Sequence, residues 1–317
     1  MQTDQTQSNN EQDIHDIRLE PGIYNLTIPI RNHLENDIPI PEEEMNVLKT
    51  FDKEYSFEKD IQERGREAVL QGLNEASKYF NFEEAKLATA EGLKMAQAIN
   101  PDAPIKPFPI VFLYIPRRGD AKSLHGQGCG INIDALQPNN LNIETPFNNI
   151  KSYTAHESVH VFLRQLRRGD ENRDKKNSFK NRILDFIWEE GLTTYIESIH
   201  YPHHYDIEND ALYWIDITNQ WLNTTDSTKK DRIFENVKRR PSFLRLLNDM
   251  YHKSSVPSSI DASEDGFNSL IRDRNGVGYH MGSYLWKKEL EKAKQEGKTL
   301  KDLVMAGSSQ MERWITE

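Results

Sequence analysis

The stretch Thr154–Leu163 constrains the fold of this chain more than any other, because it places an H-E-x-x-H motif inside an apolar run. In an α-helix, residues four apart lie on one face, so His156 and His160 would point in the same direction. Two imidazoles in this arrangement can bind one metal ion, and Glu157 would then lie near the open side of the site. The apolar residues at 161–163 predict that this helix packs against a core, which would hold the two histidines still.

Apolar periodicity divides the chain into a first part that contains β-strands and a second part that is mostly helical. The clearest strand signal is Ile110–Ile115, and the alternating segment Ile131–Asp134 predicts another short strand. Helical spacings dominate from about residue 148 onward and are clear at 179–199 and 278–295. We therefore expect an α+β fold, with a small β-sheet followed by a mainly helical C-terminal part that carries the metal motif.

The same patterns indicate three regions. Residues 1–50 are polar and interrupted by prolines, which predicts a segment that is partly disordered or extended. Residues 51–145 contain helical patterns and the strands of the small sheet, and residues 146–317 form the helical part. Within that last region, the strongly charged segment 167–181 separates two predicted helices and is expected to be exposed.

Charge and composition exclude several classes of protein. The formal net charge is −10, which disfavours a general nucleic-acid binder because nucleic-acid phosphates would be repelled. No apolar run is long enough for a membrane span, and the N-terminus lacks the basic and apolar segments of a secretory signal. The single cysteine, Cys129, cannot form an intramolecular disulfide, which fits a reducing compartment. We therefore expect a cytoplasmic protein.

A catalytic zinc site needs a third protein ligand and an open position for water. The segment Trp188–Tyr195, on the next predicted helix, contains the adjacent carboxylates Glu189 and Glu190. Glu190 could complete a His-His-Glu site if this helix packs against the motif helix, whereas the alternative is an exposed acidic pair. Glu197 lies on about the same helix face as Glu190 and would either orient a ligand histidine or face solvent.

The H-E-x-x-H motif followed by a Trp-containing E-G segment resembles the gluzincin zinc metallopeptidases, which include thermolysin-like proteases and leukotriene-hydrolase-like aminopeptidases. In the aminopeptidase branch the third ligand is the Glu before Gly, which matches Glu190 before Gly191 and leaves Glu189 as the competing register. A later tyrosine of that branch stabilises the oxyanion, and Tyr279 matches it in chain order. Thermolysin-like enzymes use a histidine for this purpose, so His280 is the alternative.

The resemblance implies a zincin-like fold with one zinc ion (Zn2+) held by His156, His160 and Glu190. It implies that Glu157 is the general base for hydrolysis of a peptide or protein substrate, and that an edge strand at Gly128–Asp134 binds the extended substrate. The G-x-M-E-N signature of the aminopeptidases is absent, because the sequence from Gly128 to Asn132 contains no Glu. We therefore expect an endopeptidase.

Two other functions are compatible with the same motifs. The chain could be a catalytically inactive zincin-fold binding module, for which the polar N-terminal segment and the charged segment 167–181 would offer contact surfaces. It could also be another metal-dependent hydrolase that uses these ligands, including one that binds iron. Metal content and peptide cleavage distinguish these alternatives from a zinc metallopeptidase.

Overall fold

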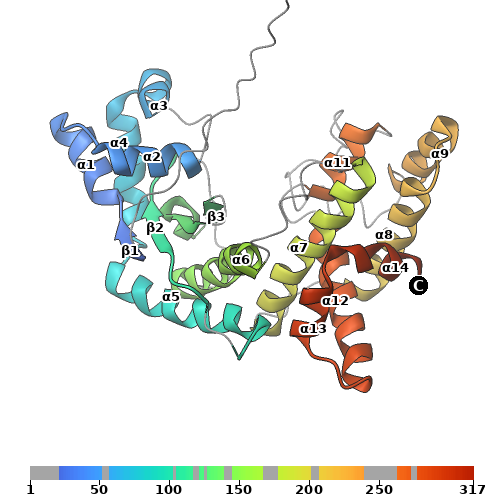
Figure 1. Ribbon diagram of the computed structural model, residues 1–317. Coiled ribbons are helices and arrows are strands. Elements are labelled where there is room, and N and C mark those ends of the chain that lie inside the picture. Colours follow the sequence, from blue (N-terminus) through green and yellow to red (C-terminus); the bar gives the residue numbers. More distant parts are fainter. Residues whose placement is uncertain are drawn as a thin grey trace, which may run out of the picture. The chain divides into compact units, whose positions relative to one another are not determined.

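The chain forms two compact units, each of which is described by itself (Figure 1). Unit 1 comprises Met1–Phe82 and Pro107–Leu141, and unit 2 comprises Glu83–Lys106 and Asn142–Glu317. The computed structural model describes residues 21–51, 57–102, 105–116, 121–124, 127–138, 145–166, 178–200, 207–238, 263–272 and 277–317. The predicted disorder at the start of the chain and most of the charged segment 167–181 lie outside these residues.

Unit 1 contains a mixed four-stranded sheet. Its strands are β1 (Gly22–Asn25), β2 (Pro109–Leu113), β3 (Ala121–Leu124) and β4 (Gly128–Asn132). Their order is β1-β2-β4-β3, with β1 and β4 parallel to β2, and β3 antiparallel to β4. The prediction of an edge strand at Gly128–Asp134 is wrong, because β4 pairs with a neighbour on each side and its backbone groups are used within the sheet.

The helices of unit 1 include two in a region expected to be disordered or extended. They are α1 (Thr27–Asn36), α2 (Glu42–Phe51), α3 (Phe57–Arg64) and α4 (Arg66–Ser77), with a 3-10 helix at Ile133–Leu136. Prolines suggested interruptions here, but Pro29 falls in the first turn of α1, where proline costs no hydrogen bond. Pro41 directly precedes α2. Residues 22–51 therefore form a strand and two helices.

Every described element of unit 2 is helical, which confirms the mainly helical C-terminal part. The helices are α5 (Phe82–Ala96, whose first residue belongs to unit 1), α6 (Pro146–Leu166), α7 (Phe179–His200), α8 (Ile207–Leu222), α9 (Ser227–Lys238), α11 (Glu264–Arg272), α12 (Val277–Gln295), α13 (Leu300–Ala306) and α14 (Met311–Thr316), with 3-10 helices at Gln97–Ile99 and Ser308–Gln310. Among the described residues, no helix has the length and apolar character to cross a membrane.

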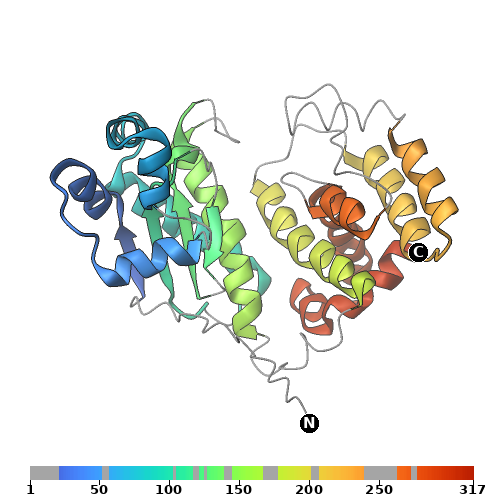
Figure 2. The same cartoon turned by 90° about the horizontal axis from the view of Figure 1, so that it is seen from above.

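Helices α7 and α12 make the most extensive helix contact among the described residues, and Figure 2 shows them side by side. Two glycines permit this approach, because a Cβ atom added to Gly191 would lie 2.5 Å from the backbone of Gly282. Nearby, Nε1 of the Trp286 indole donates a 2.8 Å hydrogen bond to the carbonyl oxygen of Trp188, and both indoles are fully buried. The two helices are therefore fixed to each other by backbone contact and a buried hydrogen bond.

Replacing Gly282 by Ala should lower the free energy of unfolding by about 2–3 kcal/mol, because the new methyl group has no room against the backbone of α7. Chemical denaturation followed by tryptophan fluorescence measures the change. Lys287→Ala, at an exposed position of the same helix, is the control and should alter stability by less than about 0.5 kcal/mol. Equal stability of Gly282→Ala and the unaltered protein would contradict the close crossing.

Candidate metal centre

Helix α6 carries the H-E-x-x-H motif and is fixed at its start and on one side. The Thr145 hydroxyl accepts a 3.2 Å hydrogen bond from a backbone N–H of the first turn, and Pro146 is the first helical residue, where a missing N–H has no cost. Helix α5 packs tightly against it, because a Cβ atom at Gly92 would lie 2.7 Å from Cβ of Thr154. The backbone is therefore held still just before His156.

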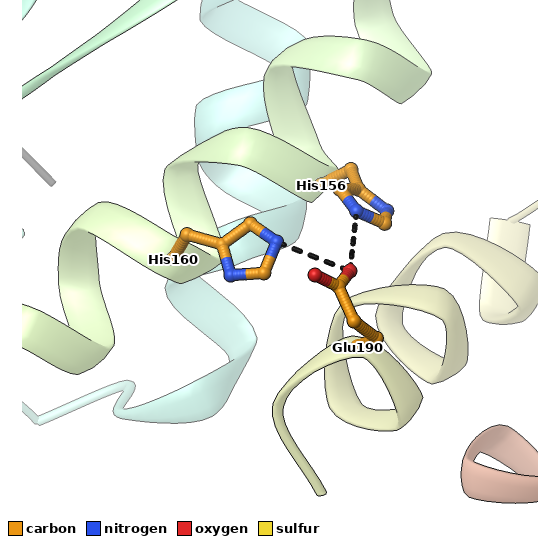
Figure 3. A group of neighbouring side chains, drawn as sticks. All are labelled: His156, His160 and Glu190. Carbon is orange, nitrogen blue, oxygen red and sulfur yellow. Dashed lines mark ion pairs between the residues drawn. The ribbon is translucent and has the colours of Figure 1, made fainter. Parts of the chain in front are cut away.

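The side chains of His156 and His160 converge on one carboxylate from α7 (Figure 3). Nε2 of each histidine lies 3.3 Å from Oε2 of Glu190. One ligand atom from each of the three residues lies within 4.8 Å of the other two, and all three side chains are half-buried. In the part of the chain that the structure describes, this is the one such group of potential metal ligands. The structure therefore brings together the three residues predicted to bind metal.

The geometry and chemistry of this group suit a metal ion. Zinc binds His nitrogen and carboxylate oxygen at about 2.0–2.2 Å in tetrahedral sites, which places neighbouring ligand atoms about 3.3 Å apart. Both nitrogen–oxygen distances to Glu190 are 3.3 Å. Oε2 of Glu190 is buried and has no hydrogen-bond partner among the described residues, so a cation between it and the imidazoles would satisfy it. The three residues could therefore hold a metal ion.

Other carboxylates contact the second ring nitrogen of each histidine. Oε1 of Glu189 lies 3.0 Å from Nδ1 of His160, and Oε2 of Glu197 lies 3.6 Å from Nδ1 of His156. Ser152, one turn before His156 on α6, donates a hydrogen bond from its hydroxyl to the other oxygen of Glu197. Contacts of this kind fix the ring orientation and the tautomer of a metal-binding histidine.

These contacts bear on two alternatives that the sequence left open. Glu189 and Glu190 are about 100° apart around α7. Glu190 therefore faces both Nε2 atoms, while Glu189 faces Nδ1 of His160. The side chain of Glu197 is 16% exposed and contacts His156 instead of pointing to solvent. The role of Ser152 was not anticipated, although its position four residues before His156 on one helix face was a usable signal.

Burial and carboxylates compete to set the protonation of the histidines in the metal-free protein. Burial lowers the pKa of His156, but the neighbouring carboxylates of Glu190 and Glu197 outweigh it and raise the pKa from 6.5 to about 9. Burial opposes protonation of His160 as well, yet Glu190 and Glu189 raise its pKa well above the usual value. Burial also raises the pKa of Glu190, but the two histidines hold it below its usual range. The surrounding carboxylates therefore favour the protonated form of both histidines when no metal is bound.

The predicted catalytic residues differ in how closely they approach the cluster of His156, His160 and Glu190. Glu157 is buried, with 9% of its surface exposed, and its charge acts on His156. The Tyr279 ring stacks on the His156 ring at a centroid distance of 6.3 Å, and the Phe186 ring meets Tyr279 edge-on at 5.5 Å. His280 lies about 100° further around α12 and does not belong to the group of clustered ligand atoms. Of these two residues, Tyr279 is the one whose ring contacts a ring of His156.

Comparisons with models of protein families, with curated proteins and with solved structures find no match to this chain. The zincin-like fold and the gluzincin relationship therefore stay predictions from the sequence motifs. The convergence of His156, His160 and Glu190 is a separate observation, because these side chains come from two helices whose packing the motifs do not specify. The function is accordingly inferred from the geometry of this group.

Glu190→Gln should weaken zinc binding more than Glu189→Gln. The first change removes a charged group that faces Nε2 of both histidines. The second removes only the contact with Nδ1 of His160, and loss of such a contact commonly costs about 10–100-fold in metal affinity. Competition with a chromophoric chelator measures both dissociation constants. Glu291→Gln, at an exposed position of α12, is the control. A greater loss in Glu189→Gln than in Glu190→Gln would reverse the assignment of the two carboxylates.

Zinc binding at pH 7 should release protons to the buffer. Both histidines carry raised pKa values in the metal-free protein, and an imidazole binds metal only after losing its proton. The pKa of about 9 for His156 also predicts that the zinc affinity decreases as the pH falls below that value. Titration calorimetry at pH 7, in two buffers with different heats of ionisation, measures the protons released. A binding heat that does not depend on the buffer would contradict this prediction.

Proposed function

We propose that this chain is a zinc-dependent metallopeptidase of the gluzincin type, which hydrolyses peptide bonds in peptide or protein substrates. The proposal depends on one observation, the convergence of His156 and His160 on Oε2 of Glu190 at 3.3 Å from each Nε2. Two histidines and one glutamate form a known ligand set of catalytic zinc. Glu157 and Tyr279 lie next to these residues and supply the two groups that hydrolysis needs, a carboxylate base and a hydroxyl donor.

Zinc in this site would supply a Lewis acid that lowers the pKa of a water molecule to about 7 and polarises the substrate carbonyl. Glu157 accepts a proton from the attacking water and then donates it to the leaving amine. Because this residue is buried within the packed helix α6, its carboxylate is held in a fixed position relative to His156. The base and the two histidines thus move together as one element.

Tyr279 donates its hydroxyl proton as a hydrogen bond to the substrate carbonyl oxygen when negative charge develops there. The stacking on His156 and the edge contact with Phe186 hold its ring in place before substrate arrives. The crossing of α12 and α7 at Gly282 fixes the backbone one turn further along. A donor that is preorganised in this way commonly contributes about 10²–10³-fold to the rate.

Glu189 and Glu197 hold the ligand histidines by their outer nitrogens. A carboxylate behind the ring accepts the Nδ1 proton, which leaves Nε2 with a lone pair directed to the metal. Ser152 restrains Glu197 by its hydrogen bond, so the longer contact of this carboxylate with His156 is supported from a second side. Once each ring has lost a proton, these contacts would favour the tautomer that a metal site requires.

The position of β4 limits how a substrate is bound. Since Gly128–Asn132 pairs with strands on both sides, these residues cannot add an extended peptide to the sheet. The absence of the aminopeptidase signature in the same segment supports an endopeptidase, which needs no pocket for a free amino terminus.

Glu157→Gln should retain zinc and lose peptide hydrolysis, because glutamine keeps the size of the side chain but cannot accept the proton. Elemental analysis measures the zinc content, and cleavage of a random peptide library followed by mass spectrometry measures activity. Glu291→Gln is the matched control and should cleave at the rate of the unaltered protein. Full hydrolysis by Glu157→Gln would overturn the mechanism, and zinc-loaded protein that cleaves no peptide would favour a binding module.

Tyr279→Phe should lower kcat by about 10²–10³-fold, with a much smaller change in KM, because the hydroxyl acts on charge that develops during the reaction. Steady-state kinetics on one cleaved peptide from the library measures this split. His280→Phe serves as the comparison, since His280 is the competing donor. A larger loss of kcat in His280→Phe than in Tyr279→Phe would assign the oxyanion contact to the histidine.

A further inference from the structure

Arg272 is an exposed cation at the C-terminal end of α11, outside the metal cluster. Its guanidinium carbon lies 4.8 Å from the centroid of the Phe186 ring. Among the described residues, no carboxylate pairs with Arg272. A guanidinium held over an aromatic face keeps its outer N–H groups available, and their planar arrangement matches a carboxylate. Arg272 is therefore a positioned cation to which the proposed reaction assigns no role.

Ring contacts connect Arg272 to the metal cluster. Phe186 precedes Glu190 by one turn on α7, and its ring meets the Tyr279 ring at 5.5 Å. Tyr279 in turn stacks on His156 at 6.3 Å. Because an extended peptide advances about 3.3–3.6 Å per residue, the whole path from Arg272 to His156 corresponds to at most about five residues. A peptide with its scissile bond at the cluster can therefore reach Arg272.

Gly278 makes this arrangement rigid. A Cβ atom at Gly278 would lie 2.6 Å from the carbonyl oxygen of Ile271 and 3.0 Å from the Phe186 ring. The residue before Arg272 and the residue before Tyr279 are thus in direct contact, with Phe186 beside both. The backbone segments that carry Arg272 and Tyr279 therefore keep a fixed spacing, and the contact with the Phe186 ring restrains the guanidinium before a ligand arrives.

The carboxylates of the cluster and the guanidinium of Arg272 carry opposite charges. Glu157, Glu189, Glu190 and Glu197 all act on the two histidines, so the cluster is rich in carboxylates. A carboxylate of the substrate is repelled from these groups, whereas Arg272 can bind it through two parallel hydrogen bonds. An acidic group of the substrate is thereby directed away from the metal residues and toward the end of α11.

We propose that Arg272 binds a carboxylate of the substrate, within about five residues of the cleaved bond, and so selects acidic peptides. An acidic side chain and a free C-terminus offer the same chemistry. The inference deepens the proposed function and rests on it, because it assigns a substrate class to the same site. It also gives α11 a part in the reaction that no sequence motif indicated.

Peptide libraries that differ in a single charge test this inference. In one pair, each position in turn is fixed as Glu or as Gln while all others are randomised over uncharged residues. In a second pair, the C-terminus is free or amidated. The zinc-loaded protein should cleave the member with the carboxylate about 10-fold faster or more, as one charge-assisted pair commonly gives. A preference confined to the first pair identifies a side chain, and one confined to the second identifies the C-terminus.

Arg272→Met should bring this ratio of rates close to one, and Arg272→Lys should retain part of it. Lys230→Met is the matched control, because Nζ of Lys230 lies 3.8 Å from the centroid of the Trp221 ring and is also a cation over an aromatic face. The control should keep the full ratio. An unchanged ratio in Arg272→Met, or equal cleavage of both members by the unaltered protein, would overturn the inference.

Binding measurements separate this inference from the proposed function. Zinc-loaded Glu157→Gln protein should bind the carboxylate member of each pair more tightly than the neutral one, and Arg272→Met in the same background should remove the difference. Such binding without cleavage by the unaltered protein would keep the role of Arg272 and refute the peptidase. Cleavage without any dependence on charge would keep the peptidase and refute the role of Arg272.

Discussion

The contact between the backbones of α7 and α12 is the constraint on which the centre of unit 2 depends. Gly191 follows Glu190 directly, and Gly282 follows Tyr279 by about one turn, so one helix crossing fixes both the carboxylate and the phenol. The buried hydrogen bond from the Trp286 indole to the carbonyl oxygen of Trp188 stabilises the same crossing. Both glycines have helical backbone conformations that other residues can adopt. Glycine is required at these two positions because there is no space for a Cβ atom between the helices.

The carboxylates around His156 and His160 fall into two sets, which contact different ring nitrogens. Glu190 faces the Nε2 atoms, whereas Glu189 and Glu197 face the Nδ1 atoms, so each imidazole lies between carboxylates. This surplus of carboxylates raises the pKa of both histidines. The same negative charge would repel an acidic substrate, and the role proposed for Arg272 follows from this property.

The parts of the site that depend on local spacing could be predicted from the sequence. The helix period brought His156 and His160 to one face, and the apolar flanks predicted a packed helix. Local spacing alone could not choose between Glu189 and Glu190, and only the resemblance indicated Glu190. The choice depends on the rotation of α7, which its packing against α12 sets. The internal position of β4 was missed for a similar reason, since strand order depends on pairing with distant segments.

Spacing along the chain also sets the order in which the centre can assemble. Helices α6 and α7 are consecutive, whereas α12 comes much later, and loop closure costs more entropy as the intervening chain lengthens. Helices α6 and α7 can therefore come together first, whereas Glu190 takes its final orientation only when α12 packs against α7. The group of potential metal ligands and the neighbouring Tyr279 are thus completed in one step, the docking of α12.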